Sequence, residues 1–208
     1  MRTILASTSP RRREILALLG LPFEVIAPDY EEVVVSHRPV RDEVLEFGLG
    51  KARSVAKDNP QSLVIGSDTM ILIEGQKIGK PGNSDEAKAM LSLLAGKNHS
   101  IFTSVAIVDG LGGPGLAQFE EVSVKMRDYG AKELDDYLAC NESLDKAGAY
   151  SIQGRGRSLI EAMEGDYLAA VGLPLKPIAD YLQSRGLAAP LDVDRLYSDK
   201  CFLNWRSF

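Results

Sequence analysis

Two short apolar runs, at residues 3–6 and 63–66, constrain the fold of this chain most strongly. A continuous run of this length, bounded by polar or turn residues, is typical of a strand buried on both faces. Helical patterns alternate with such strands along the chain, and neighbouring strand pairs around turn residues also predict hairpins. The sequence therefore predicts an α/β fold, with a mixed twisted sheet flanked by helices.

The remaining elements follow from the same kinds of pattern. Helices are expected from Pro10 to Gly20, from Ser84 to Gly96, and over residues 42–57, 132–138 and 177–184. Further strands are expected over residues 23–27, 70–73, 77–78, 101–108 and 122–126. Residues 158–163 and 167–171 are expected to form a hairpin around the turn at residues 164–166. We expect one domain over residues 1–186, while the tail, residues 187–208, has no clear period and no assigned role.

Composition excludes several classes of protein. With 45% hydrophobic and 25% charged residues, the chain is an ordinary globular sequence, and intrinsic disorder is excluded. The formal net charge of −5 disfavours a nucleic acid polymer as partner. The two cysteines, Cys140 and Cys201, form no CxxC pair, so we expect free thiols and no structural zinc. No apolar run is long enough for a signal peptide or a membrane span, so we expect a cytoplasmic protein without a membrane partner.

One glycine-rich stretch resembles a dinucleotide-binding motif. Residues 110–115 fit the pattern GxGxxG, but a strand follows them where a dinucleotide-binding loop requires a helix. Pro114 also removes an amide from any phosphate cradle. We interpret this stretch as a loop between strands.

Three consecutive arginines, Arg11, Arg12 and Arg13, begin the first predicted helix. Cations at a helix N-terminus oppose the helix dipole by about 0.3–1 kcal/mol each. A bound anion reverses that sign, because helix amides, guanidinium groups and the hydroxyls of Ser7 and Ser9 would all bind phosphate. The alternative is a solvated basic turn.

Asp68 stands at the carboxyl end of the apolar run 63–66, where ligands gather in open α/β sheets. An aspartate there could hold a hard cation, take a proton from water or cap the following turn. Glu31 and Glu32 follow another predicted strand and could complete a carboxylate set for magnesium. The alternative is that both are ordinary surface acids, and their spacing alone favours that interpretation.

Lys51, Lys80 and Gln153 complete the candidate residues. Lys80 lies in the tightly bent sequence Gly-Lys-Pro-Gly at residues 79–82, and the Gln153 amide could read a base edge or cap a turn. A nucleoside triphosphate carries about four negative charges, which two arginines, two lysines and a divalent metal would offset.

Four ordered motifs resemble the signatures of the Maf family, and together they span about residues 3–182. They are residues 5–12 with Glu14, residues 65–69 followed by 79–81, residues 145–154, and residues 164–167 with 171–175. The chain departs from the family pattern at Gly48 and Gly50, where relatives usually have bulkier residues.

This resemblance implies a nucleoside triphosphate pyrophosphatase with an inosine triphosphatase-like fold, two lobes around a cleft, and often a homodimer. Such enzymes cleave between the α- and β-phosphates and use magnesium or manganese. By resemblance, Asp68 matches the proposed catalytic base, and Glu32 with Asp68 would hold the metal. Substrate-binding positions match Ser7, Arg12, Lys51 and Lys80.

Three positions of the family separate a branch acting on dTTP and UTP from one acting on 7-methyl-GTP. Arg11, Thr69 and Gln153 match the first branch, whereas the second tends to have Trp, Gln and Glu. A Gln amide can pair with a neutral pyrimidine, while a guanidinium would repel a positively charged methylated guanine. We therefore expect dTTP and UTP as substrates. The alternatives are a 7-methyl-GTP pyrophosphatase and a non-catalytic nucleotide-binding regulator of cell division.

Overall fold

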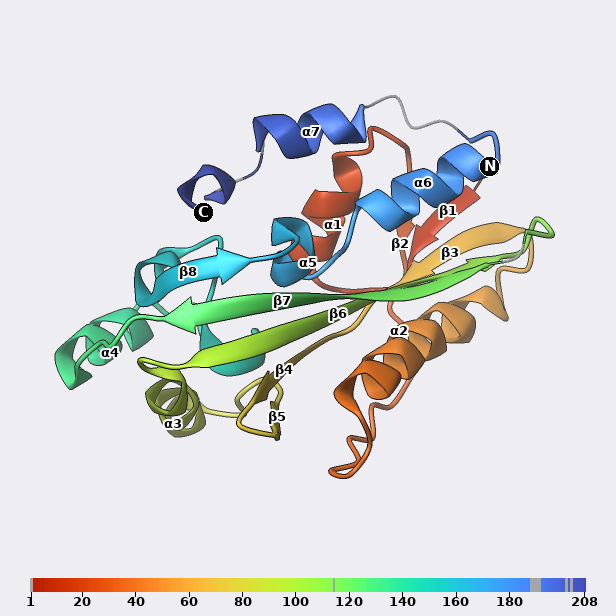
Figure 1. Ribbon diagram of the computed structural model, residues 1–208. Coiled ribbons are helices and arrows are strands. Elements are labelled where there is room, and N and C mark those ends of the chain that lie inside the picture. The colour runs from red at the N-terminus through yellow and green to blue at the C-terminus, as the bar shows by residue number, and fades with distance from the viewer. Residues whose placement is uncertain (1, 114, 188–191, 201, 203) are drawn as a thin grey trace.

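The computed structural model describes residues 2–113, 115–187, 192–200, 202 and 204–208. Its centre is an eight-stranded mixed sheet in the order β2-β1-β3-β6-β4-β5, with β7 beside β6 and β8 beside β7 (Figure 1). The strands are β1 (Arg2–Leu5), β2 (Glu24–Val25), β3 (Ser62–Gly66), β4 (Thr69–Ile73), β5 (Gln76–Ile78), β6 (Asn98–Asp109), β7 (Leu116–Met126) and β8 (Ile160–Glu164). β1 runs parallel to β2 and β3, and the other pairs are antiparallel. The predicted mixed α/β sheet is confirmed.

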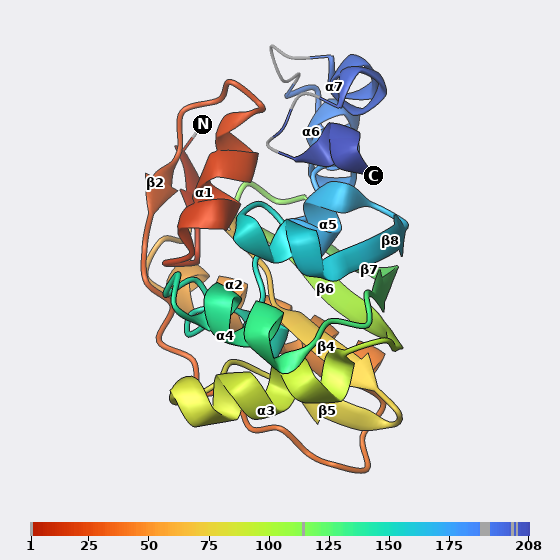
Figure 2. The same cartoon turned by 90° about the vertical axis from the view of Figure 1, so that its left-hand side faces the viewer.

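Seven α-helices occur in the described residues, and they cover both faces of this sheet. They are α1 (Pro10–Ala17), α2 (Val40–Ala56), α3 (Ser84–Leu94), α4 (Ala131–Leu138), α5 (Tyr167–Val171), α6 (Lys176–Ser184) and α7 (Val193–Asp199). Figure 1 shows α2 on one face and α1, α5 and α6 on the other, and Figure 2 shows α7 on the side of α6. Side chains alternate accordingly: Ile4 and Val64 pack in the cluster with α2, whereas Leu5 and Ile65 join the larger cluster on the opposite face.

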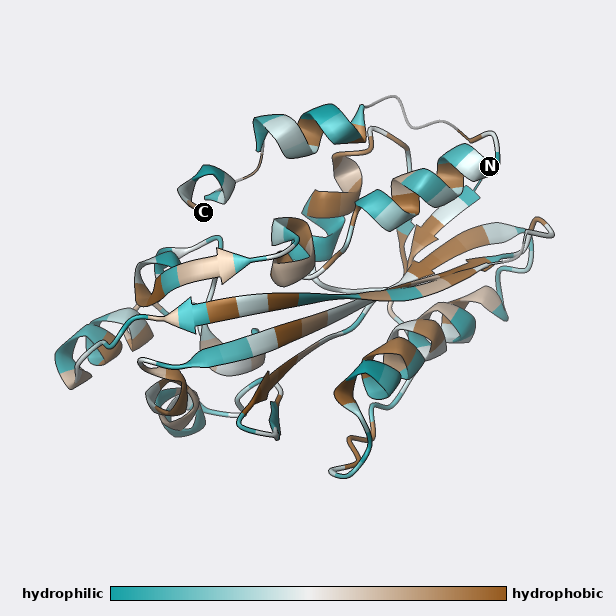
Figure 3. Ribbon diagram, viewed as in Figure 1, coloured by the Kyte–Doolittle hydropathy of each residue, from teal (hydrophilic) through white to brown (hydrophobic). Residues whose placement is uncertain are grey.

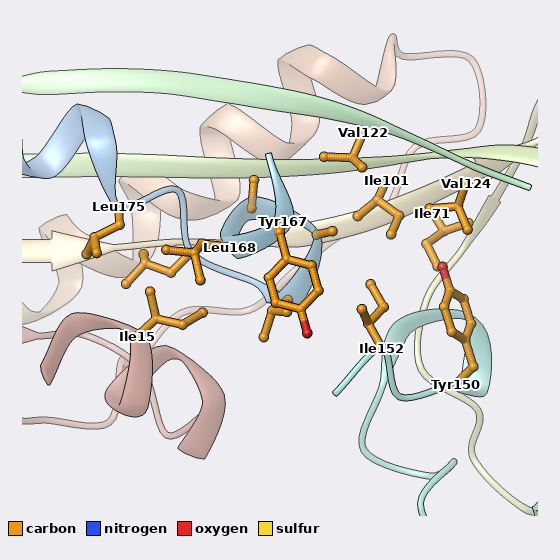
Figure 4. Close-up of a cluster of buried hydrophobic side chains, with 14 of the residues drawn as sticks. Ile15, Ile71, Ile101, Val122, Val124, Tyr150, Ile152, Tyr167, Leu168 and Leu175 are labelled. Carbon is orange, nitrogen blue, oxygen red and sulfur yellow. The ribbon is translucent and has the colours of Figure 1, made fainter. Parts of the chain in front are cut away.

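The larger core lies between the sheet and the helices α1, α5 and α6. Figure 4 shows Tyr167 in this core together with Ile15 of α1 and Ile101 of β6, and all three are at most 1% exposed. The C-terminal end of β7 alternates buried and exposed residues, and Figure 3 shows this end of the strand as bands of contrasting hydropathy. This pattern is expected of a strand with one face on the core.

β3 and β4 act as one bent strand, because both pair with the same strand, β6, in an unbroken antiparallel register. Ser67 and Asp68 form the bend and lie between the two strands. The Asp68 carbonyl accepts a hydrogen bond of 2.9 Å from the Ser104 amide, and the Ser104 hydroxyl accepts one of 3.1 Å from the Asp68 amide. The bend thus fixes the backbone of Asp68 inside the sheet.

The expected hairpin at residues 158–171 is wrong. β8 pairs with β7, and residues 167–171 form the helix α5. The Asp166 carboxylate caps this helix by accepting hydrogen bonds from the amides of Leu168, at 2.7 Å, and Ala169, at 3.2 Å. A short, fully apolar run fits a buried helix as well as a strand, so periodicity could not separate them, and the capping aspartate decides.

Other predicted elements occur with small shifts at their ends. The second strand is shorter than expected, and the side chain of Asn83, rather than that of Ser84, caps α3. The hairpin of β4 and β5 and the loop between β6 and β7 are confirmed. Pro114 and Cys201 lie outside the described residues, whereas Cys140 is a free thiol. Among the described helices, none combines the length and apolar character that a membrane span requires.

Candidate active site

A cavity of about 310 Å³ receives side chains from both faces of the sheet. Its wall includes the start of α1, the middle of α2, the bend before β4, the segment after β5, and the end of α5. Most of the predicted site residues line it: Arg11, Arg12, Glu32, Lys51, Asp68, Thr69, Lys80 and Gln153. Segments that are far apart in the sequence therefore converge on one space.

Arg12 is anchored on three sides. Its Nε donates a hydrogen bond of 2.8 Å to the Gly172 carbonyl, and its two terminal nitrogens contact Thr69 Oγ1 at 3.1 Å and Ser7 Oγ at 3.4 Å. Burial lowers the pKa of Arg12, although the nearby Asp68 opposes this shift. Because the usual arginine pKa is far above neutral, Arg12 remains a cation with a fixed orientation.

Ser7 does not line this cavity. It is buried behind Arg12, and its hydroxyl also accepts a hydrogen bond of 3.2 Å from the Ser9 amide, at the start of α1. The structure therefore places Ser7 in contact with a site residue, where it helps to orient the guanidinium.

Asp68, Lys51 and Glu32 form the charged centre of the cavity. Lys51 Nζ lies 2.5 Å from Asp68 Oδ1 and 2.5 Å from Glu32 Oε1. Burial raises the pKa of Asp68 despite the opposing effect of Lys51 and Arg12, and the negative charge of Glu32 acts in the same direction as burial. A buried carboxylate of raised pKa is a stronger proton acceptor than an ordinary aspartate.

Glycines allow α2 to bring Lys51 this close to the sheet. A Cβ at Gly66 of β3 would lie 2.8 Å from the Ala52 nitrogen and would collide with the Gly48 carbonyl. A Cβ at Gly48 would collide with the Ser104 hydroxyl, and one at Gly50 with the ring of Tyr30. Gly48 and Gly50 thus accompany close packing around Lys51.

A buried ion pair anchors the loop that carries Glu32. Lys77 Nζ lies 2.5 Å from Glu43 Oε2 and donates a second hydrogen bond of 2.5 Å to the Val35 carbonyl. The Val35 amide donates to the other oxygen of Glu43, so both sides of the loop backbone are held. The sequence patterns did not indicate Lys77 and Glu43 as partners, because nothing in their local pattern shows that they meet.

Arg11 and Lys146 share one carboxylate on the cavity wall. Arg11 Nη1 lies 3.0 Å from Asp145 Oδ2, and Lys146 Nζ lies 2.5 Å from Asp145 Oδ1. Burial would raise the pKa of Asp145, but hydrogen bonds from Lys146 and Arg11 outweigh it and lower the pKa. Lys146 belongs to the motif at residues 145–154, so that motif could have identified it as a site residue.

The side chains of Lys80 and Gln153 also line the cavity, and neither makes a hydrogen bond to another described residue. Both are therefore available to a ligand. In contrast, Arg13 and Glu31 are exposed and lie outside this cavity, so the ordinary surface interpretation holds for them.

The carboxylates of the site fit a metal ion that is bound together with phosphate. Within the described part of the chain, no three His, Cys, Asp or Glu side chains gather to hold a metal by themselves. Asp68 and Glu32 nevertheless converge on one point, the Lys51 ammonium group. Magnesium is commonly bound through one or two carboxylates and completed by substrate phosphates, so this donor pair suits it.

Comparison with known proteins supports the resemblance of the motifs. Residues 2–185 match the family model described as Maf-like protein. The chain is 42% identical over 186 residues to a dTTP/UTP pyrophosphatase of Moorella thermoacetica, covering 89% of this chain and 96% of that protein. It is 41% identical to a dTTP/UTP pyrophosphatase of Bacillus cereus, covering 88% of this chain and 94% of that protein. A crystal structure of a nucleoside-triphosphatase / dITP/XTP pyrophosphatase from Mycobacterium abscessus aligns with a TM-score of 0.42 and 19% identity, covering 92% of this chain and 100% of that chain. By the family match and the identity to these relatives, the chain belongs to the Maf family.

Proposed function

We propose that this chain is a nucleoside triphosphate pyrophosphatase that hydrolyses dTTP and UTP to the nucleoside monophosphate and pyrophosphate. Relatives that share about 41% of its residues over most of the chain carry the name dTTP/UTP pyrophosphatase. The observation that carries the proposal is the buried carboxylate of Asp68, which lies beside the cations Lys51 and Arg12 in one cavity. A site that only bound phosphate would gain nothing from a carboxylate in that position.

The reaction requires a water molecule to attack the α-phosphorus. As the new oxygen–phosphorus bond forms, the bond to the oxygen bridging the α- and β-phosphorus atoms breaks, and pyrophosphate leaves with the electron pair. Asp68 would accept the proton of the attacking water, which its raised pKa favours. The alternative role for Asp68 is to hold the metal that activates this water.

The cations of the cavity would bind the triphosphate and offset the charge on the leaving pyrophosphate. Arg12 is fixed by the Gly172 carbonyl and Thr69, while Lys80 makes no hydrogen bond to a described residue and is free to move onto phosphate. Lys51 would exchange part of its contact with Asp68 and Glu32 for phosphate oxygen. A magnesium or manganese ion held by Asp68 and Glu32 would supply further charge neutralisation at the phosphates.

Gln153, Arg11 and Thr69 support the preference for pyrimidines. Gln153 lines the cavity, and its amide, which makes no hydrogen bond to a described residue, can donate to a carbonyl of uracil or thymine and accept from the ring N–H. Arg11 places a guanidinium on the wall, which disfavours a positively charged methylated guanine. Thr69 contacts Arg12, so its effect on the base would be indirect.

The direct test is to incubate the purified protein with magnesium and a panel of nucleotides, separate the products and compare kcat/KM values. Nucleoside monophosphate with pyrophosphate, and higher kcat/KM values for dTTP and UTP than for 7-methyl-GTP, would support the proposal. Diphosphate with orthophosphate would show a different hydrolase. Tight binding without products would favour a nucleotide-binding regulator, and a preference for 7-methyl-GTP would overturn the base assignment.

We also propose a compartment and an oligomeric state for the enzyme. We place it in the cytoplasm, where a nucleotide pool is available, and as a homodimer, as resemblance to the family implies. Light scattering on the purified protein would measure the mass in solution, and a monomer across micromolar concentrations would contradict the dimer.

A further inference from the structure

The chain continues beyond the family match, which ends at residue 185, and its last segment folds back onto the core. After α7, the segment ends in a short 3-10 helix (Trp205–Ser207), and Figure 1 shows this end near α5 and β8. The Trp205 ring is buried and stacks on Tyr167, with centroids 5.4 Å apart and planes 12° apart. Arg157 donates a hydrogen bond of 2.6 Å to the Ser207 carbonyl, and its guanidinium lies 4.1 Å from the centre of the Phe208 ring. The end of the chain is therefore part of the folded core.

One contact of this segment reaches the backbone of a cavity residue. Asn204 Nδ2 donates a hydrogen bond of 2.7 Å to the carbonyl of Gln153, and the carbonyls of Ile152 and Gly154 lie 3.5 Å from the same nitrogen. Ile152 and Gln153 both line the cavity. The amide group of Asn204 thus holds the outer side of the loop whose inner side bears the Gln153 side chain.

A second contact supports another part of the cavity wall. The Tyr197 hydroxyl donates a hydrogen bond of 2.8 Å to Asp166 Oδ2, while Asp166 Oδ1 caps α5. At the other end of α5, the Gly172 carbonyl receives the hydrogen bond from Arg12. The tail therefore contacts both the loop of Gln153 and the helix that ends beside Arg12.

The conformation of Asn204 suits this role. Its φ is 62°, in the left-handed region, which Asn and Gly adopt more readily than most other residues. The Gln153 loop has further supports, since the Gly154 amide donates to Ser151 Oγ at 3.1 Å and the Arg155 amide donates to Glu142 Oε2 at 2.9 Å. Loss of the Asn204 side chain should consequently shift the loop without unfolding it.

We propose that Asn204 is a positioning residue for base selection: by holding the Gln153 carbonyl, it sets where the Gln153 amide meets the base. The phosphate-binding half of the cavity lies at Arg12, Lys51 and Lys80 and makes no hydrogen bond to Asn204. The inference rests on the proposed function, because it assumes that Gln153 reads the base of a bound nucleotide. It assigns a role to Asn204, a residue that the family motifs do not contain.

The test compares two variants with a control from the same tail. Asn204→Gly keeps access to the left-handed conformation but removes the side chain, and Asn204→Asp keeps the shape but replaces the donor with a carboxylate facing three carbonyls. Arg195→Ala is the control, because the Arg195 side chain is 79% exposed and pairs with Asp199 of its own helix. Two inhibitors separate the halves of the site: dTMP, which carries a base, and inorganic tripolyphosphate, which does not.

We expect Asn204→Gly to weaken inhibition by dTMP about 5- to 20-fold and to reduce the ratio of kcat/KM for dTTP over CTP by a similar factor. Inhibition by tripolyphosphate should change less than about 2-fold, and Asn204→Asp should exceed the effect of Asn204→Gly because its carboxylate repels the carbonyls. Unchanged dTMP inhibition in both variants would overturn the inference. Equal weakening of both inhibitors would also overturn it, since that outcome indicates a general loss of structure.

The outcome for the unmodified protein separates this inference from the proposed function. If the unmodified protein prefers a base other than thymine or uracil, the substrate assignment fails, and the variants are then compared with the monophosphate of the preferred base. A base-selective loss there would still support the role of Asn204. If the unmodified protein binds no nucleotide, both proposals are overturned.

Discussion

Lys51 and Asp68 form a buried ion pair, with Nζ 2.5 Å from Oδ1 and side chains that are 9% and 8% exposed. Lys51 comes from the middle of α2 and Asp68 from the bend between β3 and β4, so the pair joins a helix to the centre of the sheet. Burying two charges costs desolvation free energy that their attraction offsets only in part, so such a pair is weak evidence for stability. Its position in the cavity, with Glu32 on the same ammonium, points to chemistry instead.

The first prediction concerns Asp68. Asp68→Asn should retain binding of dTTP, because Arg12 and Lys51 keep their charges, but should lower kcat by about 100-fold or more through loss of the proton acceptor. Pyrophosphate release and calorimetric binding would measure the two effects. Asp29→Asn is the control, since the Asp29 side chain is 96% exposed. Equal turnover in Asp68→Asn and the unmodified enzyme would remove Asp68 from its role.

The second prediction concerns Arg12, whose guanidinium contacts Gly172, Thr69 and Ser7 at once. Arg12→Lys keeps the charge but cannot make these contacts together, so we expect kcat/KM for dTTP to fall about 10- to 100-fold. Arg13→Lys is the matched control, because Arg13 is the neighbouring residue and is exposed. Similar losses in both variants would contradict a specific role for the anchored guanidinium of Arg12.

The third prediction concerns the divalent cation. Activity should disappear after exhaustive chelation and return with magnesium or manganese, because Asp68 and Glu32 would otherwise repel the triphosphate. Glu32→Gln should raise the magnesium concentration needed for half-maximal activity, whereas Glu31→Gln, at an exposed residue outside the cavity, should not. Full activity in the presence of excess chelator would refute the requirement.

The fourth prediction concerns the crossing of α2 over β3. Gly66→Ala should lower the free energy of unfolding by about 2 kcal/mol or more, because the new Cβ would lie 2.8 Å from the Ala52 nitrogen and against the Gly48 carbonyl. Gly130→Ala serves as the control, since a Cβ there meets no atom within 4 Å. Urea unfolding measures both, and a Gly66→Ala protein as stable as the control would contradict this packing.

The fifth prediction concerns His99. This side chain is 4% exposed, and its Nε2 forms a hydrogen bond of 2.7 Å with the Tyr150 hydroxyl. Burial lowers the pKa of His99 from 6.5 to about 4. Between these values the unfolded chain binds more protons than the folded protein, so this histidine destabilises the fold as the pH falls through that window.

The measurement is the free energy of unfolding at two pH values. The contribution of His99 predicts a loss of about 2 kcal/mol between about pH 7 and about pH 5. His99→Gln should remove this part of the loss, whereas His37→Gln, at an exposed histidine, should preserve it. The same pH dependence in His99→Gln and the unmodified protein would contradict the assignment.

Local patterns in the sequence were sufficient for many elements of the fold. The apolar runs of β1 and β3, the turn between β4 and β5, and the acidic first turn of α3 were all predictable. The reason is that strand burial, turn conformation and helix starts depend on residues only a few positions apart. The motifs likewise identified Arg12, Lys51 and Asp68 as candidates, because they mark residue types suited to phosphate chemistry.

The tertiary structure alone decided how these parts meet. Residues 167–171 are apolar enough for either a strand or a helix, and as a helix they pack all five side chains into the surrounding core. The contact of Lys51 with Asp68 depends on the close approach of α2 at Gly48 and Gly66, and the contact of Asn204 with Gln153 joins residues 51 positions apart. Periodicity and propensity are local properties of the sequence, whereas such contacts depend on how whole elements pack. The sequence by itself therefore determined the strands, most of the helices and the chemical groups available. The packing of these elements determined the site.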